Sequence, residues 1–467
     1  MSATRQRLGL QDMMFLYGET PQTMMHVGGL LPFTPPADAP PDYLRRMLDD
    51  ARDREVFAPW NRKLSQPSML RSPVQSWVVD EKFDLDYHVR RSALASPGDE
   101  RELGILVSRL HSNQLDFSRP PWELHLIEGL EGGRFAIYVK IHHALVDGYS
   151  GMRILARSLS PDPDSRDNPL FFNMPTPKRG GSSHADGGSG GGISGLAKTL
   201  ADGTRSVFDL TKSAVNTQLG RDNLTGSAEA PHSILNSRIS RNRRFATQQY
   251  SRAELSEIAH AHGATLNDVA LAIIGGGLRT FLGNMGELPD KPLVAFVPVN
   301  VRAKGDEGGG NAVGAILVPI GTDIDDPVQR LARIRTATTA SKSEMQTLSR
   351  NAILAYSAGL MAPAGIQVAS AFTGVDSPWP YSFNLCVSNV PGPTETLYMN
   401  GSRLEATYPV SIPMHGMALN ITLQSYADTV NFGFIGCRDT LPHLQRLATD
   451  TGAALAELAE ATAARKE

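Results

Sequence analysis

The sequence has little cysteine and no excess of charge of either sign. Its two cysteines, Cys386 and Cys437, stand far apart among 467 residues and form no Cys-x-x-Cys pair. This spacing excludes a disulfide framework and a zinc ribbon, and it is typical of a reducing compartment. Lysine and arginine number 45 against 48 aspartates and glutamates, which gives a net charge of −3. The chain therefore has no basic field that would hold a nucleic-acid backbone.

The sequence also lacks a long uninterrupted apolar run. The most apolar window, residues 352–372, is broken by Gly359 and Pro363 and is rich in Ala and Ser. Such a window favours a buried or interfacial helical hairpin over a membrane span. The first residues form a mixed segment rather than an apolar stretch with a small-residue cleavage site. We therefore expect no secretory signal and a cytoplasmic location.

What the chain does have is enough apolar mass for more than one core. At 467 residues, with 41% hydrophobic residues, it exceeds the length at which single cores stop growing, about 250 to 300 residues. Glycine and serine dominate residues 178–195, a composition that neither packs nor fixes a backbone. We therefore expect an N-terminal half over 1–175, a flexible linker with a basic segment over 176–243, and a C-terminal half over 244–467.

Hydrophobic periodicity predicts helices and strands on both sides of this linker. Strict alternation over residues 134–141 predicts a strand with one buried face. Ser251 begins a capping box and the segment from Thr265 to Asp268 caps the next helix, so a helix is expected after each of them. Mixed elements in both halves indicate the α/β fold class. Further helices are expected over 41–54, 100–115 and 441–464 and from residue 326, and further strands over 293–299, 313–320, 382–390 and 419–425.

The most informative segment follows the strand at 134–141 and reads His142-His143-Ala-Leu-Val-Asp147-Gly148. Successive strand side chains point to opposite faces, so His142 and His143 cannot both enter one cavity. Continued alternation places His143 on the buried side, where a neutral imidazole is a suitable general base. Two other interpretations remain open for the pair, a structural hydrogen-bonded role and metal ligation, although opposite faces make a shared ion difficult.

The pattern His-His-x-x-x-Asp-Gly after a strand resembles the signature of the CoA-dependent acyltransferase superfamily, which includes chloramphenicol acetyltransferase and peptide-synthetase condensation domains. Within it, the chain is most similar to the bacterial wax ester synthase/acyl-CoA:diacylglycerol acyltransferase family. One departure is Pro121, where that family usually carries Leu before the Trp. The segments that carry the resemblance are Met25–Leu30, Pro120–Glu123, Ile127–Leu130, Asn267–Leu271, Pro298–Arg302, Ser388–Pro393 and Tyr408–Ser411.

The resemblance implies two chloramphenicol-acetyltransferase-like domains with a substrate tunnel at their interface. It assigns the role of general base to His143, and it makes Asp147 a structural brace that pairs with Arg302. A solvated position at the end of a strand is the alternative for Arg302. No serine stands in a Gly-x-Ser-x-Gly elbow, which argues against a covalent route of the lipase type. The implied reaction is direct attack on a thioester without an acyl-enzyme.

Negative charge that develops on the thioester oxygen needs a hydrogen-bond donor. Asn267 is our candidate, because it stands in the first turn of an expected helix, where amide and backbone N–H groups act together. Helix capping is the equal alternative for Asn267, and Asp268 is interpreted as a cap. Supporting site residues under the resemblance are His142, Gly148, Ser388 and Asn389.

The implied co-substrate, acyl-CoA, brings phosphate groups and a long apolar chain. The densest basic stretch contains Arg241, Arg243 and Arg244, which we assign to the CoA phosphates, with a solvated face as the alternative. Residues 354–372 have small side chains that leave room for an acyl chain, unless they form a tightly packed helix pair. The same segment, or residues 196–219, is a candidate for contact with a membrane or lipid-droplet surface.

We therefore expect a transferase that moves a long-chain acyl group from acyl-CoA to diacylglycerol, giving triacylglycerol. The resemblance implies no metal and no cofactor beyond acyl-CoA as co-substrate. Three alternatives remain open: a wax ester synthase that uses a fatty alcohol, a transferase that draws on a carrier protein, and a non-catalytic lipid-binding or droplet scaffold protein.

Overall fold

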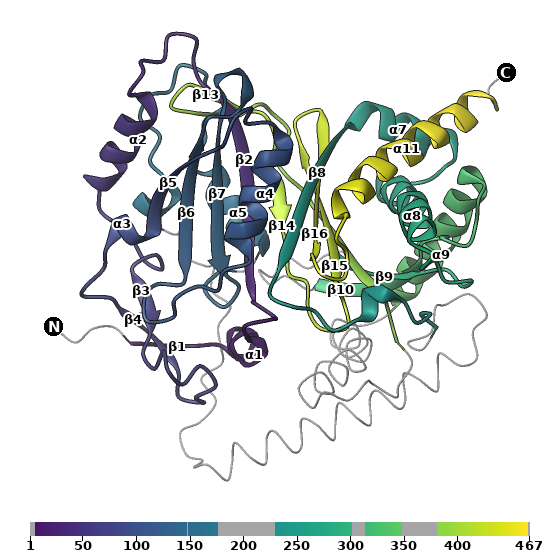
Figure 1. Cartoon of the computed structure of the whole chain (residues 1–467), viewed down its shortest axis with the longest axis horizontal. Coiled ribbons are helices and arrows are strands. Elements are labelled where there is room, and N and C mark those ends of the chain that lie inside the picture. Colours follow the sequence, from purple (N-terminus) through teal and green to yellow (C-terminus); the bar gives the residue numbers. More distant parts are fainter. Residues whose placement is uncertain (1–4, 147, 176–228, 301–312, 348–380, 466–467) are drawn as a thin grey trace.

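The computed structural model describes residues 5–146, 148–175, 229–300, 313–347 and 381–465. Figure 1 shows two halves side by side, each a β-sheet with helices packed on it. Among the residues singled out above, Asp147, Arg302 and the segments 196–219 and 354–372 lie outside this described part. None of the helices within the described ranges combines the length and apolar content that a membrane crossing requires.

A seven-stranded sheet forms the core of the first half, and β7 lies near its centre. The expected strand over 134–141 is confirmed, but the expectation of a single buried face is wrong, since all eight residues of β7 are buried. Helices α2 and α5 pack on one face and α4 packs on the other, so both faces are covered. In spatial order the strands are β12 (Tyr398–Met399), β13 (Ser402–Leu404), β2 (His26–Thr34), β7 (Phe135–His142), β6 (Trp122–Glu128) and β5 (Val89–Ala93), and β14 (Tyr408–Val410) also pairs with β2.

The helices of this half are short, and their expected positions are confirmed with small changes at the ends. Asp99 caps α4 by accepting a hydrogen bond from the Glu102 backbone N–H. This helix ends at His111, four residues before the predicted end. The helices are α2 (Tyr43–Arg52), α3 (Leu85–His88), α4 (Glu100–His111) and α5 (Gly148–Ala156).

Three strands of the first sheet come from the C-terminal part of the chain. In β14, Tyr408 pairs with Leu30 of β2 and Val410 pairs with Gly28. Strand β13 extends the pairing, with Leu404 opposite Phe33. The division expected at residue 244 is therefore crossed by residues 398–410, which lie in the sheet of the first half.

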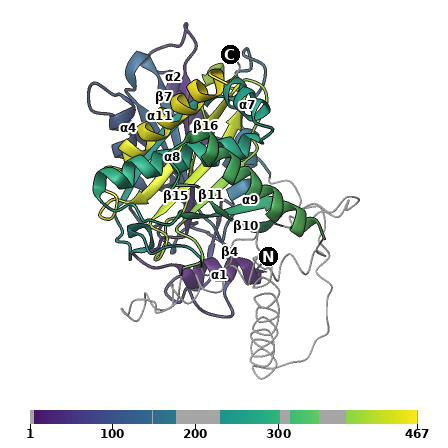
Figure 2. The same cartoon turned by 90° about the vertical axis from the view of Figure 1, so that its right-hand side faces the viewer.

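A six-stranded sheet forms the second half, and helices cover one of its faces (Figure 2). Large apolar side chains from the strands and from these helices share one core. Two of the strands, β8 and β16, were not expected from the sequence. In spatial order the strands are β10 (Val313–Pro319), β9 (Val294–Asn300), β11 (Leu385–Val390), β15 (Leu419–Tyr426), β16 (Thr429–Cys437) and β8 (Arg243–Ser251), and the helices are α7 (Arg252–Ala261), α8 (Leu266–Met285), α9 (Pro327–Thr347) and α11 (Leu444–Ala463).

Helix α8 shows how closely this helix layer packs. Its N-terminus has the expected cap, which takes the form of a capping box: Thr265 and Asp268 bond each other's backbone N–H groups. A Cβ at Gly275 would lie only 2.0 Å from the Ile320 carbonyl oxygen, and one at Gly277 only 2.6 Å from Thr451 Oγ1. Glycine is therefore required where α8 approaches the end of β10 and α11.

A small unit completes the first half beneath the end of β7 (Figure 1). It consists of a three-stranded sheet and one helix, whose apolar core includes Leu16 and Trp77 together with Phe117 and Ala144. This unit therefore packs directly against the turn that carries the His-His motif. Its elements are β1 (Gln6–Arg7), α1 (Leu10–Gly18), β3 (Arg62–Leu64) and β4 (Ser76–Val79).

Candidate active site

The site is built where β7 ends. His142 is the last residue of the strand, and its backbone N–H donates to the Pro121 carbonyl oxygen at 2.9 Å. The backbone N–H of His143 donates to the Met25 carbonyl oxygen, also at 2.9 Å. The turn is thus attached to the segment before β6 on one side and to the segment before β2 on the other. Both sides belong to the sequence segments that carry the family resemblance.

His142 is the buried histidine of the pair, with 1% of its surface exposed. Its Nδ1 accepts a hydrogen bond from the Ala144 backbone N–H at 3.1 Å, and its Nε2 lies 3.4 Å from Glu19 Oε2. The bond from Ala144 makes Nδ1 an acceptor, and the Glu19 carboxylate lies beside Nε2 as an electrostatic neighbour. Nε2 itself is buried and forms no hydrogen bond within the described residues.

His143 lies in the turn and is half-buried. The sequence alternation assigned the buried position to His143 rather than His142, and this prediction is wrong, because the alternation ends with the strand at His142. The His143 ring stacks on the Phe15 ring of α1, with centroids 3.9 Å apart and planes 19° apart. The stack and the backbone bond to Met25 fix the orientation of the imidazole.

Glu19 links three segments around this turn, and sequence reasoning missed it. Its side chain is 1% exposed. One carboxylate oxygen accepts from the Met25 backbone N–H, and the other accepts from Gln114 Nε2 at 2.6 Å. Glu19 precedes His142 by more than 120 positions, and no local pattern joins them. Only the tertiary fold brings this carboxylate to the motif.

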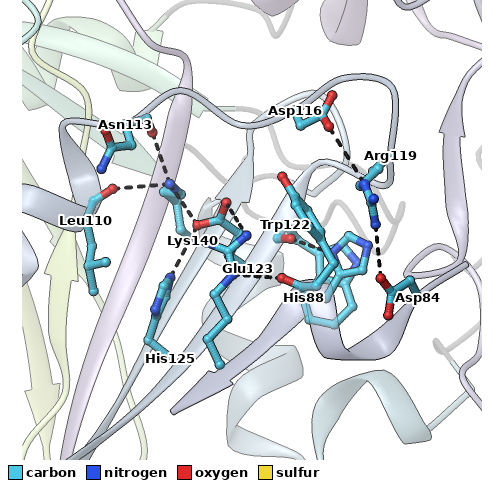
Figure 3. A network of polar contacts seen from close by, with 12 residues as sticks. Asp84, His88, Leu110, Asn113, Asp116, Arg119, Trp122, Glu123, His125 and Lys140 are labelled. Carbon is cyan, nitrogen blue, oxygen red and sulfur yellow. Dashed lines mark hydrogen bonds and ion pairs between the residues drawn. The ribbon is translucent and has the colours of Figure 1, made fainter. Parts of the chain in front are cut away.

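A buried polar network supports the sheet beside the site (Figure 3). Lys140 is fully buried, and its Nζ lies 3.0 Å from Glu123 Oε2. The same ammonium donates to the carbonyl oxygens of Leu110 and Asn113, at the C-terminal end of α4. His125 Nε2 lies 3.3 Å from Glu123 Oε2. The network therefore holds the end of α4 against β6 and β7.

The charges in this network stabilise one another. Burial raises the pKa of Glu123, but the hydrogen bond from His125 and the charges of Lys140 and Arg90 outweigh it and lower the pKa to about 2. Burial lowers the pKa of Lys140, and the Glu123 carboxylate opposes this shift. A paired and fully bonded charge of this kind is structural rather than catalytic.

The oxyanion assignment of Asn267 does not agree with the structure. Asn267 stands in the first turn of α8, next to Asp268, whose carboxylate accepts from Thr338 of α9 at 2.7 Å. Helix α8 lies in the helix layer of the second half, away from β7 (Figure 1). The described structure therefore does not bring Asn267 to His143. The predicted capping role of Asp268 is confirmed.

The remaining supporting residues stand on other elements or are only partly described. Ser388 and Asn389 stand on β11, opposite Thr422 and Leu423 of β15, and Asn389 is exposed. Gly148 is the first residue of α5. The proposed partners Asp147 and Arg302 are outside the described residues.

The three arginines assigned to CoA differ in their surroundings. Arg243 is 2% exposed, and its guanidinium donates to the carbonyl oxygens of Ser240 and Gln22. Burial lowers the pKa of Arg243 to about 10. The structure does not support the CoA assignment of Arg243, because its side chain is buried against backbone carbonyls. Arg241 is exposed, and Arg244 is half-buried at the edge of a cleft.

Comparison with known proteins agrees with this geometry. Residues 8–270 match the model of the wax ester synthase/diacylglycerol acyltransferase catalytic domain, and residues 309–459 match that of the WS/DGAT C-terminal domain. A Mycobacterium tuberculosis protein named diacylglycerol O-acyltransferase is 61% identical, with 99% of each chain covered. The O-acyltransferase WSD of Acinetobacter baylyi is 40% identical, with 94% of this chain and 93% of that protein covered.

Solved structures show the same relationship. The wax ester synthase/diacylglycerol acyltransferase from Marinobacter aquaeolei VT8 matches with a TM-score of 0.80 and 39% identity, over 98% of this chain and 100% of that chain. The first condensation domain of the CDA synthetase matches with a TM-score of 0.54 and 16% identity, over 98% and 97% of the two chains, and shares the fold. The expected fold class is thereby confirmed. The chain belongs to the wax ester synthase/diacylglycerol acyltransferase family and is an O-acyltransferase.

Proposed function

We propose that the chain transfers a long-chain acyl group from acyl-CoA to the free hydroxyl of diacylglycerol and so makes triacylglycerol, a storage lipid. The observation that carries this proposal is the His143 turn, held by its backbone on two sides and by a ring stack on the third. The choice of acceptor is supported by the relative that is 61% identical and carries the name diacylglycerol O-acyltransferase.

In the proposed reaction, His143 is the general base. A ring nitrogen of His143 takes the hydroxyl proton as the acceptor oxygen attacks the thioester carbonyl carbon. The carbon–sulfur bond then breaks, and the leaving thiolate receives the proton from the imidazolium, which gives the ester and free CoA. Stacking on Phe15 holds the ring in one orientation, which reduces the entropy cost of reaching the transition state.

Three neighbours complete the proposed machinery. His142 and Glu19 hold the turn through the Ala144 N–H and the Met25 N–H. We assign Asp147, in the same motif, to a brace with Arg302, as the family resemblance implies. A buried bidentate pair of this type fixes a loop without entering the chemistry.

Contact with a lipid surface is part of the proposal. Among the described residues, the large apolar side chains that are most exposed are Met14 at 61%, Met69 at 61% and Val74 at 59%. Met14 lies on α1, and the other two lie between β3 and β4, in the unit that carries Phe15. Exposed apolar side chains next to the site suit an acceptor that partitions out of water.

Wax ester synthesis is the second candidate. It is favoured by the match to the Marinobacter protein, which is named for both activities and has a TM-score of 0.80. In this reaction a long-chain fatty alcohol replaces diacylglycerol, and the roles of His143 and the thioester stay the same.

The test is a turnover assay with both acceptors. The purified chain is incubated with a long-chain acyl-CoA and either diacylglycerol or hexadecanol, and free thiol and lipid products are followed together. We expect thiol release that depends on the acceptor, and its loss in His143→Ala by at least about 100-fold. His260→Ala, which removes an exposed histidine of α7, is the matched control and should keep full activity.

Each other result points to a different answer. Faster turnover with hexadecanol would favour wax ester synthesis. An active His143→Ala variant would overturn the base assignment. A parent chain that turns over neither acceptor would favour a carrier-protein donor or a non-catalytic lipid-binding role.

A further inference from the structure

A cleft of about 800 Å³ lies where the two halves of the molecule meet. One wall is the N-terminal part of α4, from the first half. The opposite wall is formed by β8 and by the first two turns of α11, from the second half. Pockets of this size accept a nucleotide-sized ligand.

The lining of this cleft is rich in guanidinium groups. Arg101 comes from α4, Arg244 from β8, Arg438 from the segment after β16, and Arg446 from α11. Among the described residues, no carboxylate forms an ion pair with Arg101 or Arg244. Arg244 Nε is buried and has no hydrogen-bond partner in that part of the chain. At least one buried guanidinium donor in the cleft wall, Arg244 Nε, is thus without a protein acceptor among the described residues.

The two acidic side chains of the lining are already engaged. Glu100 lies 3.0 Å from Arg134. Asp439 accepts hydrogen bonds from Ser240 Oγ at 2.6 Å and from Asn242 Nδ2 at 2.9 Å, and it also lies 3.7 Å from Arg438. They therefore do not neutralise Arg101 and Arg244.

The N-terminus of α11 adds to the positive potential. This 20-residue helix begins after His443, which forms no side-chain capping bond, and no acidic residue stands in its first turn. Arg446 occupies that turn instead, and it lines the cleft together with Pro442, His443 and Gln445. A cation at the positive end of a helix dipole is unfavourable unless an anion is bound there.

The guanidinium groups also repel one another. Burial lowers the pKa of Arg244, and the charges of Arg438 and Arg101 lower it further. Cations that face the same space cost stability, and a bound anion relieves this cost. A polyanion would thus gain several charge-assisted hydrogen bonds at once.

The position of the cleft relative to the His143 turn indicates which anion the cleft binds. Leu30 of β2 lines the cleft, and His26, four residues earlier on the same strand, pairs with His142. Four residues of β-strand span about 13 Å. CoA fits this arrangement in kind, because its pantetheine arm extends from the phosphates to the thioester.

We propose that the cleft lined by Arg101, Arg244, Arg438 and Arg446 binds the phosphate groups of the CoA portion of the acyl donor. The proposal rests on the proposed function, since it assumes that acyl-CoA is the donor. It replaces the earlier assignment to a contiguous run of arginines with a site built from both halves of the molecule.

The test separates binding from turnover. Adenosine 3′,5′-bisphosphate, CoA and dephospho-CoA are titrated by calorimetry into the parent, the double variant Arg101→Gln/Arg244→Gln and the control Arg252→Gln, which changes an exposed arginine of α7. We expect the double variant to weaken bisphosphate and CoA binding at least about tenfold, and the control to leave both unchanged. Dephospho-CoA should bind the parent more weakly than CoA does.

Other outcomes would overturn the proposal. Equal affinity of the parent and the double variant for the bisphosphate would do so. So would loss of binding to phosphatidylglycerol vesicles with CoA affinity intact, which would assign the cleft to a lipid headgroup. Binding of inorganic phosphate as strong as that of the bisphosphate would assign it to free phosphate. If the double variant fails to fold, Arg446→Gln at the exposed rim replaces it, with a smaller expected loss of bisphosphate affinity, up to about fivefold, and an unchanged affinity would overturn the proposal. Nucleotide binding needs no turnover, so failure of the proposed function would appear only in the lipid assay.

Discussion

The two ends of α4 differ in how their charges are satisfied. At the C-terminal end, Lys140 donates to two backbone carbonyls and pairs with Glu123, all within the protein (Figure 3). At the N-terminal end, Arg101 faces a cleft in which Arg244 also has no carboxylate partner among the described residues. At one end of α4 the buried charges are thus paired within the protein, and at the other end Arg101 and Arg244 have no such partners among the described residues.

The difference separates structural charges from charges available to a ligand. A buried ion with all its donors bonded contributes to the folded state and has nothing left to offer a substrate. Cations that share a cleft without acceptors reduce stability until an anion binds. The same residue types therefore serve two purposes, and their hydrogen-bond partners decide which.

Substitution in the Lys140–Glu123 network, at the C-terminal end of α4, should have the largest effect on the free energy of unfolding. Glu123→Gln leaves the Lys140 ammonium buried without its carboxylate, so we expect a loss of about 3 to 5 kcal/mol in the free energy of unfolding. Urea denaturation measures it. Arg46→Gln, which removes an exposed ion pair with Asp42, is the control and should cost less than about 1 kcal/mol. Similar losses in both variants would contradict the structural role of the network.

The second largest effect is expected from acid, which should lower the free energy of unfolding through two buried histidines, His111 and His26. Burial lowers the pKa of His111 well below its usual value, as do the charges of Arg243 and Lys140, and burial likewise lowers the pKa of His26. The unfolded state therefore binds protons that the folded state does not, so stability is complete above about pH 6.5 and falls below it. From pH 7.5 to 5.5 the two histidines together should cost up to about 3 kcal/mol.

Urea unfolding at both pH values checks this prediction. His111→Gln should show roughly half of the pH-dependent loss, because one of the two titrating groups is gone. If the variant kept the full pH dependence of the parent, His111 would not be its source.

A variant of Glu19 tests whether the buried contacts around the His-His turn support catalysis. Glu19→Gln keeps an acceptor for the Met25 N–H but removes the negative charge beside His142 Nε2. We expect kcat to fall about tenfold and KM for acyl-CoA to stay within about twofold, since the residue acts through the turn. A change confined to KM would place Glu19 at the substrate instead.

The smallest effect is expected at the rim of the arginine-lined cleft. Arg446 is exposed, so Arg446→Gln should raise KM for acyl-CoA less than about fivefold and leave kcat unchanged. Steady-state kinetics at low and high salt measure the change. The difference between parent and variant should shrink with added salt, because exposed charges are screened. A difference that persisted at high salt would argue that Arg446 binds the ligand in a dry pocket.

Local signals in the sequence predicted much of the fold. The Thr265 cap and the strand before the His-His motif depend on neighbouring residues, and both are present in the structure. Strands β8 and β16 were missed, although they form a long pair in which Phe245 stands opposite Ile435. In β8 the polar residues hide the alternation, so that only pairing across the sheet shows the strand. In β16, Val430, Phe432 and Phe434 do alternate with Asn431 and Gly433, and the sequence carried a strand signal that was not used.

The site was harder to predict, because it depends on contacts between distant segments. The motif pointed to His143, but it did not show that Glu19 lies beside His142 or that Phe15 of α1 stacks on His143. Asn267 belongs to a segment that matches the family, but a sequence match does not state where a helix lies in space. The structure places Asn267 in the first turn of α8, in the helix layer. Arg243 looked available in the sequence and is buried in the fold.

Strand β14 has a consequence for engineering within this family. Val410 lies beside Gly28 of β2, so the sheet that presents the His-His motif is completed by the far end of the chain. A chimera that joins the first 240 residues of one relative to the remainder of another would combine β2 and β14 of different parents. Exchange of substrate preference between relatives therefore requires that residues 398–410 be moved together with the N-terminal half.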